Sequence, residues 1–130
     1  MIFLDSSAIY ALADRDDRDG PLVDAFLKEN RISLATTNLV FAEAISLTTK
    51  RLGKRVGEKT GDLLQDSRFI ELVYLDEKTQ REAWQLYKKY KDKDFDLIDA
   101  TSFVFCQKRG IHEALTLGRH FAQMGFKIFP

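Results

Sequence analysis

The stretch MIFLDSSA, residues 1–8, opens the chain with a short apolar run that ends in an acid. Because no helix can precede it, this run predicts a strand over residues 1–5, buried on both faces of a parallel sheet. The residues that follow favour a helix over Ala8–Ala13, with Ser6 or Ser7 as its N-cap. A strand that leads directly into a helix is the first unit of an α/β fold.

The same alternation continues through the rest of the chain. Apolar spacing and turn residues predict further strands over residues 32–36, 69–75, 114–117 and 127–129. They predict helices over residues 21–30, 38–52, 56–66, 77–90, 96–109 and 119–124. Strands that alternate with helices indicate a three-layer α/β/α sandwich with a mainly parallel central sheet. No linker or internal repeat interrupts the pattern, so we expect one domain over residues 1–130.

The composition restricts the classes of protein to consider. With 130 residues and 45% hydrophobic content, the chain can build one core, and its net charge of +0 gives no general attraction to nucleic acid or to an anionic membrane. The single cysteine, Cys106, lies in an apolar run, which predicts a buried thiol and a reducing compartment. No apolar stretch approaches the roughly 20 residues of a membrane span, and no signal peptide is recognisable. We therefore expect a cytoplasmic protein.

Three acids, Asp5, Glu43 and Asp99, are set into apolar sequence where a charge is costly. A buried carboxylate loses solvation that a cation, a proton or several hydrogen bonds must replace. Each acid has an ordinary interpretation: Asp5 as a helix N-cap, Glu43 as a partner of a buried Lys or Arg, and either Asp96 or Asp99 as a first-turn acid favoured by the helix dipole. The helix dipole accounts for one of Asp96 and Asp99, and the other remains unexplained.

Three converging carboxylates would repel one another unless a divalent cation neutralised them. In parallel sheets ligands gather beyond the carboxyl ends of the strands, where Asp5 is expected. Oxygen ligands without a His or Cys cluster select Mg²⁺ or Mn²⁺, and His112 and His120 lack the spacing of a zinc pair. Such a site commonly activates water beside a phosphate, so the pattern predicts phosphodiester hydrolysis.

A nucleic-acid substrate would need a local basic surface because the whole chain is neutral. The densest candidate consists of Lys50, Arg51, Lys54 and Arg55, followed by Lys59. The equally good alternative is a solvated helix end. There is no Gly-rich phosphate loop and no Ser-His-Asp arrangement, so covalent catalysis has little support.

Four segments in this order resemble the PIN-domain family, especially the VapC-type toxin ribonucleases: IFLDSSA (2–8), TTNLVFAE (36–43), DFDLIDATSF (94–103) and LTLGRHFA (115–122). Each segment alone is weak, but their order and intervals are specific, and they cover nearly the whole chain. The resemblance implies an α/β/α sandwich, an acidic Mg²⁺ or Mn²⁺ site and RNA cleavage by a toxin. It also implies a small antitoxin as partner and a homodimer.

By position, the resemblance assigns the first three acids of the family site to Asp5, Glu43 and Asp99. Ser6 or Ser7 would help to hold a metal-bound water or a ligand carboxylate. The last acid of the family falls where this chain has Gly118, which supplies no ligand oxygen. A metal held partly by that acid should therefore bind more weakly, or a second ion should be lost.

Three explanations of Gly118 stay open at this point. Asp96, about one helical turn before Asp99, could supply the missing charge. Three carboxylates could also suffice, since Mg²⁺ keeps several waters in most sites. Finally, the chain could be a disabled copy, natural or selected during cloning, that binds RNA or an antitoxin without turnover. A Mg²⁺-dependent phosphatase ranks last, because Ser6 and Ser7 follow Asp5 where a second Asp would be needed.

Overall fold

Strands and helices alternate along the chain in the computed structural model, which describes residues 1–130. The strands are β1 (Ile2–Leu4), β2 (Leu34–Thr37), β3 (Ile70–Val73), β4 (Glu113–Leu115) and β5 (Lys127–Phe129). The helices are α1 (Ser6–Ala13), α2 (Gly20–Asn30), α3 (Asn38–Leu52), α4 (Lys54–Asp66), α5 (Glu77–Lys89), α6 (Leu97–Arg109) and α7 (His120–Gln123). Every predicted element is present, and no boundary differs by more than two residues.

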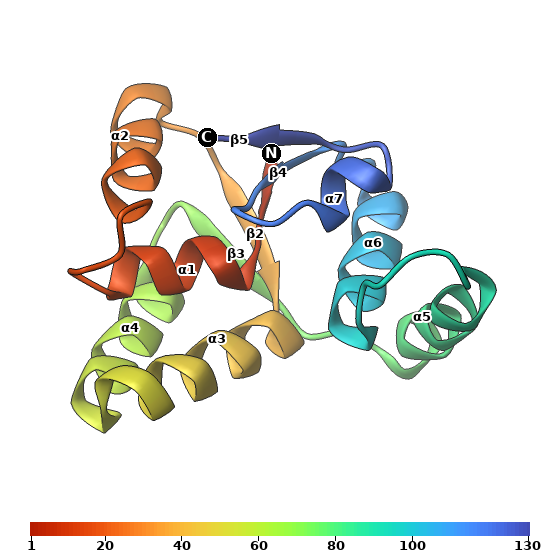
Figure 1. Ribbon diagram of the computed structural model, residues 1–130, viewed down its shortest axis with the longest axis horizontal. Helices are drawn as coiled ribbons and strands as arrows, with labels where there is room; N and C mark the ends of the chain where they lie inside the picture. The colour runs from red at the N-terminus through yellow and green to blue at the C-terminus, as the bar shows by residue number, and fades with distance from the viewer.

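The five strands form one parallel sheet in the order β3-β2-β1-β4-β5. Helices α1 to α4 lie on one side of the sheet and α5 to α7 on the other, as Figure 1 shows. This distribution follows from right-handed crossovers, because the chain winds outward from β1 to β3 and then returns to β4 and β5. The predicted α/β/α sandwich is confirmed, and the direction of winding reverses between β1 and β4.

The central strand β1 is buried along its whole length, as expected for a strand covered on both faces. Phe3 stacks on Phe121 with ring centroids 5.5 Å apart, and Phe121 meets Phe103 edge-on at 4.9 Å. Such aromatic pairs contribute about 0.5–1.5 kcal/mol each beyond the area they bury. They fix α6 and α7 against β1, and so they position the loops at the end of the sheet.

Two helices, α3 and α6, begin at a local side-chain cap. The hydroxyl of Thr37 caps α3 by accepting a hydrogen bond from the Val40 amide, and Asp96 caps α6 through the Asp99 amide. The prediction that Ser6 or Ser7 caps α1 is wrong. Asp5 occupies the N-cap position, and its side chain makes no cap bond. Ser6 and Ser7 lie inside the helix, and their hydroxyls donate to acids.

The remaining expectations on burial can also be compared with the structure. Cys106 is fully buried in α6, as predicted, and burial raises the pKa of its thiol. None of the helices combines the length and the apolar character that a membrane crossing requires.

Candidate active site

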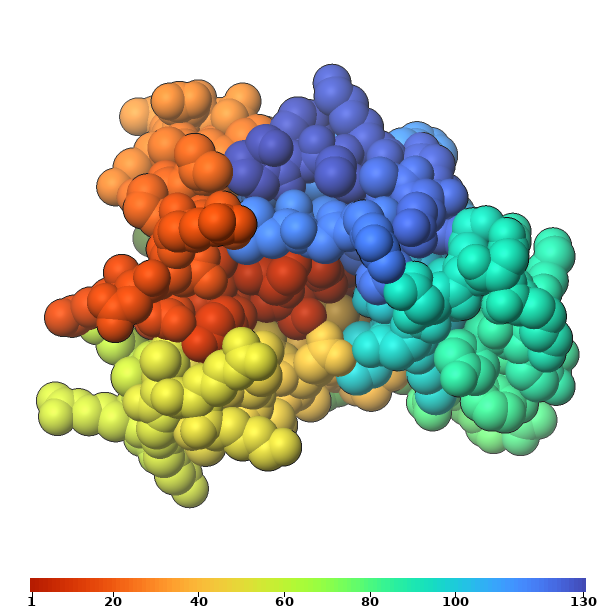
Figure 2. All heavy atoms as spheres, in the orientation of Figure 1, coloured from red at the N-terminus to blue at the C-terminus, as the bar shows by residue number.

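The predicted acids come together at the carboxyl end of the sheet. Asp5 follows β1, Glu43 lies in the second turn of α3, and Asp99 lies in the first turn of α6. Figure 1 shows the starts of α1, α3 and α6 facing one another there, and the same segments meet near the middle of the face in Figure 2. Ligands of open parallel sheets gather at this place, where the winding reverses.

Hydrogen bonds from the first turn of α1 and from the loop after β4 hold Asp5. Its Oδ2 accepts a hydrogen bond from Thr116 Oγ1 at 2.7 Å and another from Ser7 Oγ at 3.0 Å. The two hydroxyls are 3.2 Å apart, and the backbone amides of Leu117 and Gly118 donate to Ser7 Oγ and Thr116 Oγ1. One oxygen of Asp5 is therefore fixed across the β1–β4 boundary.

Glu43 lies beside the buried stripe of α3 rather than within it. The buried residues of this helix are Val40, Ala44 and Thr48, whereas Glu43 is half-buried. Its Oε1 accepts a hydrogen bond of 2.6 Å from Ser6 Oγ, and no Lys or Arg pairs with it. Burial raises the pKa of Glu43 despite this bond, and the negative charges of Asp96 and Asp5 raise it further.

Asp96 and Asp99 form a reciprocal capping box at the start of α6. Asp96 Oδ1 accepts from the Asp99 amide at 2.8 Å, and Asp99 Oδ2 accepts from the Asp96 amide at 3.0 Å. Capping therefore occupies one carboxylate oxygen of each acid. Burial first, and then the charges of Asp96 and Asp5, raise the pKa of Asp99 to about 7.

The three predicted ligands share one arrangement. In Asp5, Glu43 and Asp99, one carboxylate oxygen is held by hydrogen bonds and the other accepts none within the protein. None of these second oxygens is fully buried, because the only fully buried unpaired side-chain atom is His120 Nδ1. Three acids thus keep an accessible oxygen each, which leaves them able to bind a cation.

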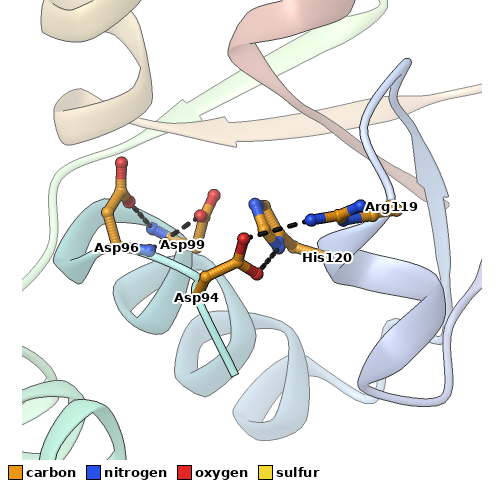
Figure 3. Close-up of polar contacts among 5 residues, drawn as sticks. All are labelled: Asp94, Asp96, Asp99, Arg119 and His120. Atoms are coloured by element: carbon orange, nitrogen blue, oxygen red, sulfur yellow. Dashed lines mark hydrogen bonds and ion pairs between the residues drawn. The ribbon is translucent and has the colours of Figure 1, made fainter. Parts of the chain in front are cut away.

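Two residues of the run after β4 pair with a different acid, Asp94. Figure 3 shows Arg119 and His120 converging on Asp94, with the His120 ring beside the Asp99 carboxylate. Arg119 Nη2 donates to Asp94 Oδ2 at 3.1 Å, and His120 Nδ1 lies 3.6 Å from Asp94 Oδ1. The hydrogen bond from Arg119 lowers the pKa of Asp94. Asp94 is therefore paired with a cation rather than available to replace the acid missing at Gly118.

The donor chemistry of the site suits a hard divalent cation, because every candidate ligand is a carboxylate oxygen. In the present side-chain positions, no three His, Cys, Asp or Glu side chains converge closely enough to surround an ion. Ser6 holds one oxygen of Glu43, and the Asp96 amide holds one oxygen of Asp99. Binding an ion would require side-chain rotations that bring the free oxygens together.

The predicted basic stretch lies away from the acids. Lys50 and Arg51 are in the last turn of α3, and Lys54 and Arg55 begin α4. Seven residues separate Lys50 from Glu43, which is about 10 Å along the helix at ~1.5 Å per residue. Arg51 also lies over the ring of Tyr10, with its guanidinium carbon 5.3 Å from the centroid. The stretch therefore lies about two helical turns from Glu43, at the other end of α3.

Comparison with known proteins identifies the family. The family described as PIN domain matches residues 2–127. The chain belongs to the PIN-domain family. A curated relative, the 23S rRNA-specific endonuclease VapC20 of Mycobacterium tuberculosis, is 25% identical over 126 residues, which cover 97% of this chain and 95% of the relative. The prediction of a PIN-domain nuclease, a hydrolase, is thereby confirmed.

Solved structures show the same fold. The crystal structure of M. tuberculosis VapC20, described as a sarcin-ricin loop cleaving toxin, has a TM-score of 0.93 at 23% identity, with 100% of both chains covered. FitAcB from Neisseria gonorrhoeae has a TM-score of 0.73 at 17% identity, covering 100% of this chain and 97% of that one. DNA-bound VapBC from Salmonella typhimurium has a TM-score of 0.71 at 13% identity, covering 98% and 97%.

Sequence reasoning did not identify Thr116, which makes the shortest hydrogen bond to Asp5. A signal was present, because Thr116 directly follows β4 and so occupies the same kind of strand end as Asp5. The pairing of Asp94 with Arg119 was also missed. These residues are 25 positions apart, and no local pattern links them.

Proposed function

We propose that this PIN-domain protein is an endoribonuclease that depends on Mg²⁺ or Mn²⁺ and acts as the toxin of a toxin–antitoxin pair. The observation that carries the proposal is the set of three free carboxylate oxygens on Asp5, Glu43 and Asp99 at one end of the sheet. The raised pKa values of Glu43 and Asp99, which come first from burial and then from the neighbouring acids, support it, because a divalent cation compensates both effects.

Each residue has a distinct part in this proposal. Asp5, Glu43 and Asp99 would hold the ion, which when bound activates a water molecule and engages a phosphate oxygen. Ser7 and Thr116 orient the Asp5 carboxylate, and Ser6 orients that of Glu43. These hydroxyls keep one oxygen of each acid in place while the other remains free for the ion.

Asp99 should also make metal binding depend on pH. Because its pKa is raised to about 7, the free protein holds a proton on this carboxyl in part of the population at neutral pH. An ion would displace that proton, since it binds the carboxylate form. Metal binding should therefore release protons, and it should tighten as the pH rises through 7.

The remaining parts of the proposal rest on the family resemblance. A small antitoxin would cover the acidic site, and the toxin would act as a cytoplasmic homodimer. The single domain over residues 1–130 and the contribution of Lys50, Arg51, Lys54 and Arg55 to RNA binding belong to the same proposal. Its relative VapC20 is named as specific for 23S rRNA, which makes structured ribosomal RNA a suitable first substrate to try.

A cleavage assay tests the central proposal. The chain is incubated with ribosomal RNA in the presence of Mn²⁺ or of EDTA, and the fragments are resolved by electrophoresis. We expect discrete fragments with Mn²⁺ and none with EDTA. Absence of cleavage by both this chain and its Gly118→Asp variant would contradict the proposal.

Gly118 favours a second candidate function, a PIN-like protein that binds RNA or an antitoxin with weak or no turnover. The glycine provides no ligand oxygen, and Arg119 beside it is paired with Asp94. Cleavage by the Gly118→Asp variant alone would support this second candidate. A chain without measurable Mn²⁺ affinity would support it as well.

A further inference from the structure

Helix α5 exposes two stacked aromatic rings. Trp84 is 47% exposed and Tyr87 is 40% exposed, and their ring centroids lie 5.5 Å apart with the planes inclined by only 17°. The adjoining face of the helix is packed on α6, with Ala83 fully buried. The helix is therefore already anchored, and packing within this chain does not explain the outward rings.

Lysines lie at the end of the same helix and in the loop that follows it. Lys88 Nζ lies 5.8 Å from the centroid of Trp84, and Lys89 and Lys93 lie 5.6 Å and 5.0 Å from that of Tyr90. From residue 88 to residue 93 there are four lysines, the fourth being Lys91, and only one acid. Lys88, Lys89 and Lys91 form no ion pair with an acid. In a chain of zero net charge, this segment is a local excess of positive charge beside exposed aromatic surface.

A hollow in the surface extends from Trp84 to the start of α6. A surface hollow of about 750 Å³ is lined by Trp84 and Gln80 of α5 and by Leu97, the first residue of α6. Leu97 directly follows Asp96. The charged residues of this hollow, Glu77 and Arg81, pair with each other at 2.6 Å and so nearly cancel. A strand of nucleic acid lying along the hollow would lead from the rings to the start of α6.

The loop between the two helices is fixed by packing. Tyr90 contacts Phe95 edge-on at 6.0 Å, and Phe95 contacts Phe103 of α6 at 5.2 Å. Phe95 is itself buried. Figure 2 shows α5 projecting at the edge of the molecule beside the start of α6. The rings are therefore held at a set position relative to Asp96 and Asp99.

We propose that Trp84 and Tyr87, with Lys88, Lys89 and Lys91, form a stacking platform for unpaired bases of RNA. The bases stack on the two rings, and the lysines neutralise the neighbouring phosphates. This inference rests on the proposed function, since it assigns that function a binding site for single-stranded RNA next to its acids. It differs from the basic stretch at residues 50–55, which spans the end of α3 and the start of α4 and has only Tyr10 within cation–π distance.

The charges favour RNA over a second copy of the chain. A two-fold contact between copies places the same patch opposite itself, so the unpaired lysines of the two copies would be brought together. Like charges opposed in this way are unfavourable, whereas the phosphates of RNA would compensate them. The occupant that best fits aromatic rings and unpaired lysines together is a single-stranded polyanion with exposed bases.

Trp84 itself supplies the measurement, because it is the only tryptophan of the chain. Its fluorescence is followed while a single-stranded RNA of about 12 nucleotides is added in EDTA, so that metal-dependent cleavage cannot occur. We expect the emission to be quenched by the single strand and much less by a duplex of equal length. Unchanged emission under saturating single-stranded RNA would overturn the platform.

Variants test the same surface without relying on the tryptophan signal. The affinity for end-labelled RNA is measured by anisotropy, and we expect Tyr87→Ala to weaken binding about fivefold or more, the range of a lost base-stacking contact. Trp84→Phe, which keeps a ring, should bind more tightly than Trp84→Ala. Phe69→Ala is the matched control, since Phe69 is 64% exposed but precedes β3 at the opposite end of the sheet. Circular dichroism verifies that each variant is folded.

Three outcomes separate this inference from others. If the Trp84→Ala and Tyr87→Ala variants lower the mass measured by sedimentation but leave RNA affinity unchanged, the surface is an interface between copies and the platform is wrong. If cleavage with Mn²⁺ occurs while these variants bind RNA normally, only the platform fails. If single-stranded RNA quenches Trp84 but no cleavage is found, the proposed nuclease function fails and the platform remains.

Discussion

The two sides of the acidic site are built in different ways. On the β1 side, Asp5 is fixed by Ser7 and Thr116, whose hydroxyls are themselves bound by backbone amides. On the side that follows β4, Thr116 supports Asp5 but is not an acid, Gly118 offers no side chain, and Arg119 is paired with Asp94. The first side is organised before any ion arrives, whereas the second contributes no ligand. We infer that the Asp5 side determines where an ion binds and that the Gly118 side limits how tightly it binds.

Asp5→Asn should have the largest effect, because it removes the charge from the best-organised ligand. We expect the rate of RNA cleavage with Mn²⁺ to fall at least about 100-fold, since charge stabilisation by a bound ion amounts to several kcal/mol. The rate is measured with labelled RNA under single-turnover conditions. Asp92→Asn is the control, as Asp92 is an exposed acid whose only partner is the neighbouring Lys93. Equal rates for the two variants would contradict the assignment of Asp5.

Thr116→Ala tests whether the organisation of Asp5 matters apart from its charge. The variant loses the 2.7 Å bond to Asp5 and leaves the carboxylate itself in place. We expect cleavage or Mn²⁺ affinity to fall about 10- to 100-fold, the usual effect of losing a partner that orients a ligand. Thr49→Ala is matched to it, because Thr49 only bonds to the Ile45 carbonyl of its own helix. An unchanged Mn²⁺ affinity together with an unchanged rate would show that Asp5 does not need this support.

Gly118→Asp should make the two sides more alike. A Cβ at residue 118 would have only Thr116 Oγ1 within 4 Å, at 3.8 Å, so a side chain can begin there without displacing its neighbours. We expect the affinity for Mn²⁺, measured by calorimetry, to increase roughly tenfold, because a carboxylate is added to an oxygen site. Gly110→Asp is an unsuitable control because that glycine has a φ of 68°, so Gln123→Asp on the exposed side of α7 is used instead. An unaltered affinity would mean that residue 118 does not face the ion.

The sequence predicted the fold well because each element carries its own local signal. The apolar run at β1, Thr37 before α3 and the charge-dense loop before α6 all act within a few residues of the element they define. The acids Asp5, Glu43 and Asp99 could be nominated for a related reason, since a carboxylate in apolar sequence is locally conspicuous. Their pairing with specific hydroxyls could not be predicted.

The contacts that the sequence did not predict join residues far apart in the chain. Ser6 bonds to an acid 37 residues away, and Thr116 bonds to one 111 residues away. Such pairs depend on the order of strands in the sheet, which the alternation of elements leaves open. The wrong prediction of a serine cap on α1 has the same origin, because local sequence favours a cap and the tertiary partner of each hydroxyl was unknown.

The smallest expected effect concerns stability and again separates the two sides. Asp99 is buried beside two other acids, and its pKa is raised to about 7, whereas an unfolded Asp titrates near ~3.9. Between these values the folded protein binds a proton that the unfolded chain has lost, so stability should fall as the pH rises from about 4 to 7 and stay low above it. Asp99→Asn cannot ionise, and its amide oxygen can still accept the bond from the Asp96 amide.

We therefore expect Asp99→Asn to be more stable than the unmodified chain at pH 8 in EDTA, by about 1 kcal/mol after allowance for solvent screening. At pH 4 the difference should disappear, because Asp99 is then protonated in the folded protein. Urea unfolding at the two pH values, repeated with Asp92→Asn, measures this. If Asp99→Asn is destabilised equally at both, the capping role of Asp99 outweighs its charge. Added Mn²⁺ should reverse the order at pH 8, since only the chain with Asp99 offers the ion that third carboxylate.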